Sequence, residues 1–387
     1  MTKASYMYNI TLLAHRLLCY LVVLHIIVTV QSIDTYKRVC YVSRTSFMPI
    51  SAIPPSLCTH LIFAFAMIND KGSLVPVHNT DVQIYKELLS MKNENPDLRI
   101  LISVQNGFDV MLTSNITMKN SFAESAVSFL KRYQFDGLDL DWEPAFPLEP
   151  SKVSGYAELC LVMKKWLGKF SNTKADAYLL SAALYANMTK ASYMYNITLL
   201  AQIMDFVTIM TYDYHLFILN KDTRTGYNSP LYTAIGEPSY WSVKGTVDFY
   251  LKNKMPATKI MMGFPTYGRT YKLANPNQFG LHAPAVGHGD PGPIRKLRGI
   301  YTYQDVCYSV ERCPTTWDDT SKVPYLHNGT TWLSFDNIPS AREKCSWLKT
   351  YKLGGVGIWA VHMDDFSNMC KTGLFPLISF WKKCLNT

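Results

Sequence analysis

Short apolar runs alternate with longer amphipathic segments along the chain from residue 38 onward. The runs suit strands that are buried on both faces of a sheet. The segments between them, such as DVQIYKELLSMK at 81–92, carry apolar residues at helical spacing. Eight such units predict an α/β fold and, more specifically, a (β/α)8 TIM barrel. The eight runs span residues 38–43, 60–66, 98–104, 135–143, 177–186, 205–213, 259–268 and 356–363.

The stretch between the seventh and eighth runs is too long for a single helix. It holds Pro/Gly-rich loops such as APAVGHGDPGPI, short alternating pieces such as TTWLSFDNI, Trp317, Trp332 and two cysteines. These features predict a small α+β insertion rather than a linker. The expected organisation is a signal peptide at 1–32, the first part of the barrel at 33–269, the insertion at 270–340 and the last part of the barrel at 341–387.

The amino end has the features of a secretory leader. Arg16 precedes an apolar run from Leu17 to Val30, which is short for a membrane span and suits a signal peptide. An uncleaved signal anchor is the alternative. Residues 1–14 recur letter for letter at 188–201, so no function is assigned to the first copy.

Cysteines, sequons and charge narrow the class of protein further. Removing Cys19 with the leader leaves eight cysteines, an even number that suits an oxidising compartment. Asn-x-Thr sequons begin at Asn115, Asn187, Asn196 and Asn328. The net charge of +9 is spread without a run of five or six basic residues, which argues against a nucleic-acid partner. The chain is therefore expected to be a secreted, extracellular glycoprotein.

The fourth run, FDGLDLDWEP at 135–144, is unusually acidic. Asp139, Asp141 and Glu143 lie two apart, so on a strand they point the same way, about 6–7 Å from one another. Ionising three carboxylates in a confined site is unfavourable, so the pKa of at least one of them should rise. The outermost, Glu143, is therefore a candidate general acid. A solvated acidic strand face is the plain alternative. A calcium site fits poorly because Leu and Trp interleave the acids where a Gly-centred loop is needed.

Two later segments favour the catalytic interpretation. MTYDY at 210–214 ends the sixth strand, and Trp359 ends the eighth. The carboxyl ends of barrel strands are where such enzymes carry their chemistry. Each segment also has an ordinary structural explanation, as a turn cap and as a core tryptophan.

The acidic stretch resembles the DxxDxDxE signature of family-18 glycoside hydrolases, which comprise chitinases and chitinase-like lectins. The resemblance extends over residues 36–384. Besides the signature it includes VCYV, LCTHLIFAFA, MTYD, NSPLY, GFPTYGR, GIWAV followed by DDF, and FPLIS. It implies retaining, substrate-assisted hydrolysis of β-1,4 bonds between N-acetylglucosamine units, in which the substrate's own N-acetyl oxygen attacks the anomeric carbon.

The same resemblance implies a role for individual residues. Glu143 would be the acid/base, Asp141 would hold the acetamido N–H, and Asp139 would share a proton with Asp141. Tyr212 would bond the acetamido oxygen, and Asp136 would be structural. The implied substrate-binding residues are Tyr41, Phe65, Met210, Asp213, Tyr267, Arg269 and Trp359. The implied disulfides are Cys40–Cys58 and Cys307–Cys370, which leaves Cys160, Cys313, Cys345 and Cys384 with open pairing.

The chain departs from the family pattern mainly at sugar-stacking positions. The third strand usually ends Ser-x-Gly-Gly-Trp, but here it reads SVQNGF, with Gln105 and Asn106 at the glycines and Gly107 at the Trp. The Asn-Trp pair after the first strand and the Gly and Trp after MTYDY are also missing. With fewer aromatic side chains to stack on sugars, the cleft is expected to bind crystalline chitin more weakly and to prefer short oligomers.

Two functions from different classes follow. The first is a secreted chitinase, and the second is a non-catalytic chitinase-like lectin that binds chitooligosaccharides or glycans. Retention of Glu143 favours the enzyme, and the altered third strand favours the lectin. The expected partners are chitin or N-acetylglucosamine oligosaccharides. No cofactor or metal, no nucleic acid, no membrane contact after leader removal and a monomeric state are expected.

Overall fold

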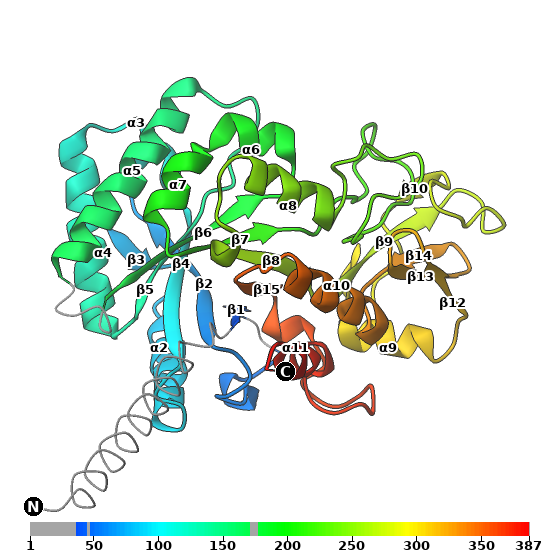
Figure 1. Cartoon of the computed structure of the whole chain (residues 1–387). Coiled ribbons are helices and arrows are strands. Elements are labelled where there is room, and N and C mark those ends of the chain that lie inside the picture. Colours follow the sequence, from blue (N-terminus) through cyan, green and yellow to red (C-terminus); the bar gives the residue numbers. More distant parts are fainter. Residues whose placement is uncertain (1–35, 45–46, 171–176, 387) are drawn as a thin grey trace, which may run out of the picture. The chain divides into compact units, whose positions relative to one another are not determined.

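A closed barrel of eight parallel strands forms the centre of the fold (Figure 1). The computed structural model describes residues 36–44, 47–170 and 177–386, and the predicted signal peptide lies outside them. Strand β1 pairs with both β2 and β15, so the sheet closes on itself and the predicted TIM barrel is confirmed. The barrel strands are β1 (Lys37–Ser43), β2 (His60–Ile68), β4 (Arg99–Asn106), β5 (Gly137–Asp141), β6 (Leu179–Tyr185), β7 (Phe206–Met210), β8 (Ile260–Pro265) and β15 (Gly355–Trp359).

Helices follow most of the barrel strands, and a short strand β3 (Leu74–Pro76) forms a hairpin with β2. In the ranges that the structure describes, no helix is both long and apolar enough to cross a membrane. The helices are α2 (Asp81–Ser90), α3 (Phe108–Thr113), α4 (Ile116–Tyr133), α5 (Pro150–Lys169), α6 (Met188–Met194), α7 (Ile197–Ile203), α8 (Val243–Lys252), α9 (Tyr303–Val310), α10 (Ile338–Thr350) and α11 (Pro376–Leu385). Single turns of 3-10 helix lie at Ile50–Ala52, Met91–Asn93, Ala257–Lys259 and Val361–Met363.

Apolar side chains from several strands fill the barrel interior. One buried cluster joins Val39, Ile62, Leu101, Phe206 and Met261, which come from β1, β2, β4, β7 and β8. Side chains that alternate with these point outward and pack against the helices. The near-continuous apolar runs in the sequence are the consequence, because these strands bury both faces.

A second sheet is inserted between β8 and β15. Its core packs Tyr271, Val323 and Trp332 against Tyr227, which lies in the loop between β7 and α8. Its first strand begins at Tyr267, whereas the insertion proposed from the sequence starts at residue 270, so β9 continues almost directly from barrel strand β8. The strands are β9 (Tyr267–Leu273), β10 (Ala285–Gly287), β11 (Ile300–Thr302), β12 (Thr315–Asp318), β13 (Val323–Asn328) and β14 (Thr331–Ser334).

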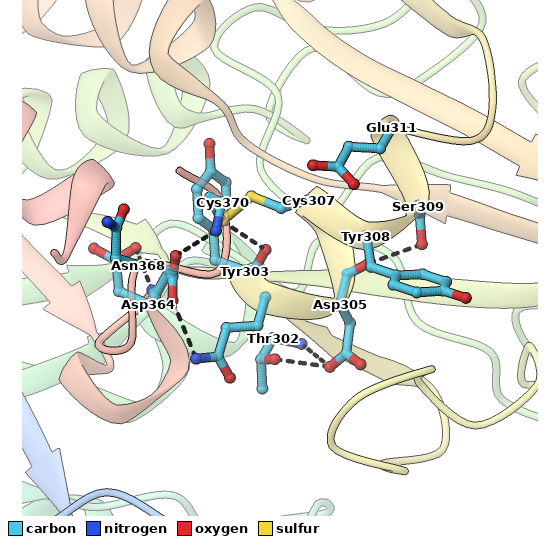
Figure 2. The surroundings of a disulfide bond; sticks show 12 residues. Thr302, Tyr303, Asp305, Cys307, Tyr308, Ser309, Glu311, Asp364, Asn368 and Cys370 are labelled. Atoms are coloured by element: carbon cyan, nitrogen blue, oxygen red, sulfur yellow. Dashed lines mark hydrogen bonds between the residues drawn. A yellow bond between two sulfur atoms is a disulfide. The ribbon is translucent and has the colours of Figure 1, made fainter. Parts of the chain in front are cut away.

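Three disulfides cross-link the described part of the chain. The two that the resemblance implied, Cys40–Cys58 and Cys307–Cys370, are present. Figure 2 shows the second of these, which joins α9 to the segment that follows β15. The third, Cys345–Cys384, ties α10 to α11. Cys160 and Cys313 are free thiols, the first buried and the second half-buried.

Candidate active site

The carboxylates of the acidic motif lie in a row at the carboxyl end of β5. Asp139 and Asp141 are buried inside the strand, and Glu143 is exposed two residues beyond it. Trp142 points the opposite way and stacks on Tyr156 of α5 at 4.7 Å between ring centroids. Asp141 and Glu143 line a cleft of about 570 Å³. The alternation of side chains along β5 therefore places Asp139 and Asp141 inside the barrel and Glu143 at its opening.

Asp139 is the deepest acid, and three hydroxyl groups bond its carboxylate. The Ser181 Oγ donates to one oxygen at 2.6 Å, and the Ser103 Oγ donates to the other at 2.8 Å. The Tyr41 hydroxyl donates to this second oxygen at 3.4 Å. Burial raises the pKa of Asp139 to about 6 although the three donors oppose this shift.

Asp141 and Glu143 form an interacting pair. Burial, followed by the charge of Glu143, raises the pKa of Asp141 well above its ordinary value. Desolvation, followed by the charge of Asp213, raises the pKa of Glu143. A carboxyl group with a raised pKa keeps its proton to higher pH, which is what a general acid requires. The Oδ1 atom of Asp141 is buried and has no hydrogen-bond partner among the described residues.

Aromatic rings form the floor of the cleft. Trp359, at the end of β15, stacks on Phe65 at 5.9 Å with an interplanar angle of 23°, and its ring centroid lies 5.7 Å from that of Tyr41. All three side chains line the cleft, as do Met210, the last residue of β7, and Tyr212, two residues beyond it. A flat, half-buried indole suits stacking on the apolar face of a sugar. Burial raises the pKa of Tyr212, so its hydroxyl remains a donor at neutral pH.

Asp213 lines the cleft, and side chains from β9, the first strand of the insertion, bind its carboxylate. Arg269 donates from Nε to Asp213 Oδ1 at 2.6 Å and from Nη2 to Oδ2 at 2.5 Å. The Tyr267 hydroxyl donates to Oδ1 at 2.8 Å. This fork-like ion pair is the strong, geometry-defining kind. Tyr267 and Arg269 therefore reach Asp213 and do not themselves line the cleft.

Asp136, the first acid of the motif, lies away from the cleft. Its carboxylate accepts from Lys92 Nζ at 2.7 Å and from the backbone N–H of Ile100 at 2.6 Å. Residue 136 precedes β5, whereas the cleft lies beyond the other end of the strand. Asp136 thus joins β5 to its neighbour β4 at the amino end of the barrel.

Several cleft residues were not predicted from the sequence. Gln105 was recognised only as a departure from the family pattern, and its side chain enters the cleft. Tyr185 at the end of β6 and Lys190 in α6 carried no signal, since each follows an ordinary apolar strand. The segment between β7 and α8 forms another wall of the cleft. Its lining residues are Leu216, Ile218, Lys221, Asp222, Tyr240 and Trp241.

The described ranges contain no group of three His, Cys, Asp or Glu side chains arranged to hold a metal ion.

A closed parallel barrel with stacked carboxylates at the end of one strand and an aromatic floor beside them defines a barrel glycoside hydrolase scaffold. Residues 37–364 match the model of the glycosyl hydrolases family 18. The chain belongs to this family.

The relatives of the chain include both active and inactive proteins. Mouse chitotriosidase-1 is 35% identical over 373 residues, which cover 90% of this chain and 78% of that protein. An immunomodulatory active chitinase from Trichuris suis superposes with a TM-score of 0.84 at 30% identity, covering 90% of this chain and all of that one. Human YKL-39, described as a pseudo-chitinase with retained chitooligosaccharide binding, superposes with a TM-score of 0.85 at 31% identity, covering 91% and 100%.

Proposed function

We propose that the protein is a secreted chitinase that hydrolyses β-1,4 bonds between N-acetylglucosamine units. The observation that supports this most strongly is the row of Asp139, Asp141 and Glu143, which have raised pKa values and lead from the barrel interior to a cleft floored by Trp359. A binding protein has no need to hold a carboxyl group at a pKa suited to proton transfer.

In the first step of the proposed reaction, protonated Glu143 gives its proton to the glycosidic oxygen. The bond from the anomeric carbon to that oxygen breaks, and the leaving sugar departs with the proton. The substrate's own acetamido oxygen forms a bond to the anomeric carbon and yields an oxazolinium ion. Glu143 is left as a carboxylate.

In the second step the Glu143 carboxylate takes a proton from water, and the oxygen of that water attacks the anomeric carbon. The bond to the acetamido oxygen breaks, the acetamido group is restored, and Glu143 is protonated again. The configuration is retained because two displacements occur at the same carbon.

Asp141 and Tyr212 suit the two ends of the acetamido group. The unpartnered Oδ1 of Asp141 can accept the acetamido N–H, and the negative charge of Asp141 would stabilise the cationic intermediate. The Tyr212 hydroxyl would donate to the acetamido oxygen and orient it for attack. Asp139, bonded to three hydroxyls, would support Asp141 from below.

Short oligomers are the proposed substrates. Long crystalline chitin requires a row of stacking rings, and Gly107 is found where the family carries a tryptophan. Gly107 has φ of +92°, and a Cβ atom there would lie 2.1 Å from the backbone oxygen of Ile68. A larger residue is therefore excluded unless the backbone changes.

A chitinase-like lectin is the second candidate, and one observation favours it. Gln105 bonds both Asp141 and Glu143 and occupies room beside them. A cleft filled in this way could keep its affinity for oligosaccharides while losing turnover. YKL-39, which has a comparable fold, has been solved in the presence of chitooligosaccharides.

Turnover of a fluorogenic di- or tri-N-acetylchitooligosaccharide by the purified protein separates the two candidates. Release of the fluorophore, with soluble oligomers cleaved faster than insoluble chitin, is expected. Calorimetric binding of tri-N-acetylchitotriose without any release would favour the lectin instead. Equal rates on oligomers and on insoluble chitin would contradict the proposed substrate preference.

Three disulfides in the described residues support passage through an oxidising compartment. All four sequon asparagines are exposed. Asn115, Asn187 and Asn196 each cap a helix, accepting a backbone N–H through Oδ1. Capping leaves Nδ2, the atom that carries an N-linked glycan, free for modification. Asn187 is the sequon that also lines the cleft.

Protein secreted from eukaryotic cells is therefore expected to lose mass on treatment with peptide N-glycosidase. Thr189→Ala should abolish the Asn187 glycan while leaving the helix cap in place, and it should speed the cleavage of longer oligomers because the cleft rim is cleared. Thr117→Ala, which blocks the sequon at Asn115, is the matched control and should leave turnover unchanged. An unaltered mass after enzymatic treatment would argue against glycosylation.

A further inference from the structure

The side chain of Gln105 bridges Asp141 and Glu143, two of the acids that line the cleft. Its Nε2 donates to Asp141 Oδ2 at 3.3 Å and to Glu143 Oε1 at 3.1 Å. An amide nitrogen carries two hydrogens, so one can point at each carboxylate. The opposite orientation of the amide would turn its oxygen toward two carboxylate oxygens, which is unfavourable whenever either acid is ionised.

Strand pairing explains why this contact forms. Strand β4 runs parallel to β5 with Ser103 beside Asp139, and side chains two residues apart on a strand face the same way. Ser103 donates to Asp139, and Gln105 donates to Asp141, so two successive donors on β4 face two successive acids on β5. The longer Gln105 side chain then reaches on to Glu143.

We propose that Gln105 is a positioning residue that ties Glu143 to Asp141 and favours the ionised state of both carboxylates. The kinetic part of this proposal rests on the proposed function. A donor favours the ionised form of its acceptor, so Gln105 counteracts the desolvation that raises the pKa of both acids. Loss of the Gln105 amide should therefore leave Glu143 protonated to higher pH.

Other charged or titratable groups act on the same pair, and they must stay constant in any test. Asp213 raises the pKa of Glu143, and Lys190 lowers it. Asp139 raises the pKa of Asp141. The remaining titratable neighbours are the phenols of Tyr41 on β1, Tyr185 on β6, Tyr195 after α6 and Tyr212 after β7.

Gln105 also occupies volume. It is half-buried and lines the cleft beside Asp141, where the family pattern has a glycine with no side chain. Two variants separate the volume from the hydrogen bonds. Gln105→Leu keeps a side chain of similar size without donors, and Gln105→Gly removes both. Asn106→Gly is the matched control, because Asn106 is the next position on the same strand, lines a different hollow and does not line this cleft.

The experiment records kcat/KM against pH for the wild type and the three variants with a fluorogenic tri-N-acetylchitooligosaccharide. In Gln105→Leu and Gln105→Gly, the fall in rate at high pH is expected to move up by about one pH unit, since the lost hydrogen bonds stabilised the carboxylates. Only Gln105→Gly should also lower KM, because only glycine opens the space. A profile that stays unchanged in both variants, with Asn106→Gly equal to the wild type, would overturn the proposal.

A second measurement does not depend on turnover. Carboxyl carbon NMR of protein labelled at glutamate, with Glu143 assigned by its loss in Glu143→Gln, follows the titration of Glu143 directly. An upward shift of that titration in Gln105→Leu supports the proposal even if the wild type proves to be a lectin. Turnover in the wild type with an unmoved Glu143 titration would overturn the role of Gln105 and leave the chitinase function intact.

Discussion

Replacing Glu143 with glutamine is expected to lower the hydrolysis of chitooligosaccharides by at least about 10²-fold, since general acid–base catalysis contributes roughly 10²–10⁴-fold. Glutamine has nearly the shape of glutamate and still fills the mouth of the cleft, but it has no proton to give to the leaving oxygen. Binding of the oligosaccharide should survive, because the aromatic floor formed by Trp359, Phe65 and Tyr41 is unchanged.

The measurement is release of a fluorophore from di- and tri-N-acetylchitooligosaccharides, with calorimetric binding of tri-N-acetylchitotriose recorded in parallel. Glu149→Gln is the matched control, since Glu149 is exposed, lies outside the cleft and forms no side-chain cap on α5. If Glu143→Gln and Glu149→Gln retained the same activity, the proton would have to come from another group.

Replacing Lys344 with methionine is expected to destabilise the protein by about 3–5 kcal/mol, because a buried charge would lose its partner. Lys344 in α10 is fully buried, and its Nζ lies 2.6 Å from Asp336 Oδ1 and 3.0 Å from the Ser229 hydroxyl. Burial lowers the pKa of Lys344, and Asp336 opposes that shift. Methionine fills much of the volume but leaves the Asp336 carboxylate without a cation.

Denaturant unfolding with the disulfides intact measures this loss. The double variant Lys344→Met with Asp336→Leu should recover most of the stability, since both charges are then removed. Lys244→Met is the control. Lys244 pairs with Asp248 on the exposed face of α8, where such a pair contributes roughly 0.3–0.5 kcal/mol. Equal losses in Lys344→Met and Lys244→Met would show that burial does not strengthen the Lys344 pair.

The fold was predictable because its signal is local. Each barrel strand buries both faces, so each appears as an apolar run, and the eight runs correspond to β1, β2, β4–β8 and β15. The ends of the runs were less accurate. The run at 135–143 includes Glu143, whereas β5 ends at Asp141, because apolar alternation continues after ladder pairing has stopped.

The detailed contacts of the site could not be read from the sequence, because they join residues that are far apart in it. Arg269 reaches Asp213 across 56 positions, and Gln105 reaches Glu143 across 38. From the sequence, Gln105 was recognised only as a larger side chain at a position where the family has glycine beside the cleft. Which atoms it bonds depends on the register between β4 and β5, and no local pattern reveals that register.

The hydrogen bonds from β9 to Asp213 limit where chimeras of this fold can be joined. The inserted sheet resembles a removable module, since a single segment of the chain between β8 and β15 forms all of its strands. However, its first strand supplies the two side chains that fix a wall residue of the cleft. Exchanging the insertion between homologues therefore also exchanges the side chains that hold Asp213 in the cleft wall. Chimeras joined after Arg269 should preserve that wall better than chimeras joined at the end of β8.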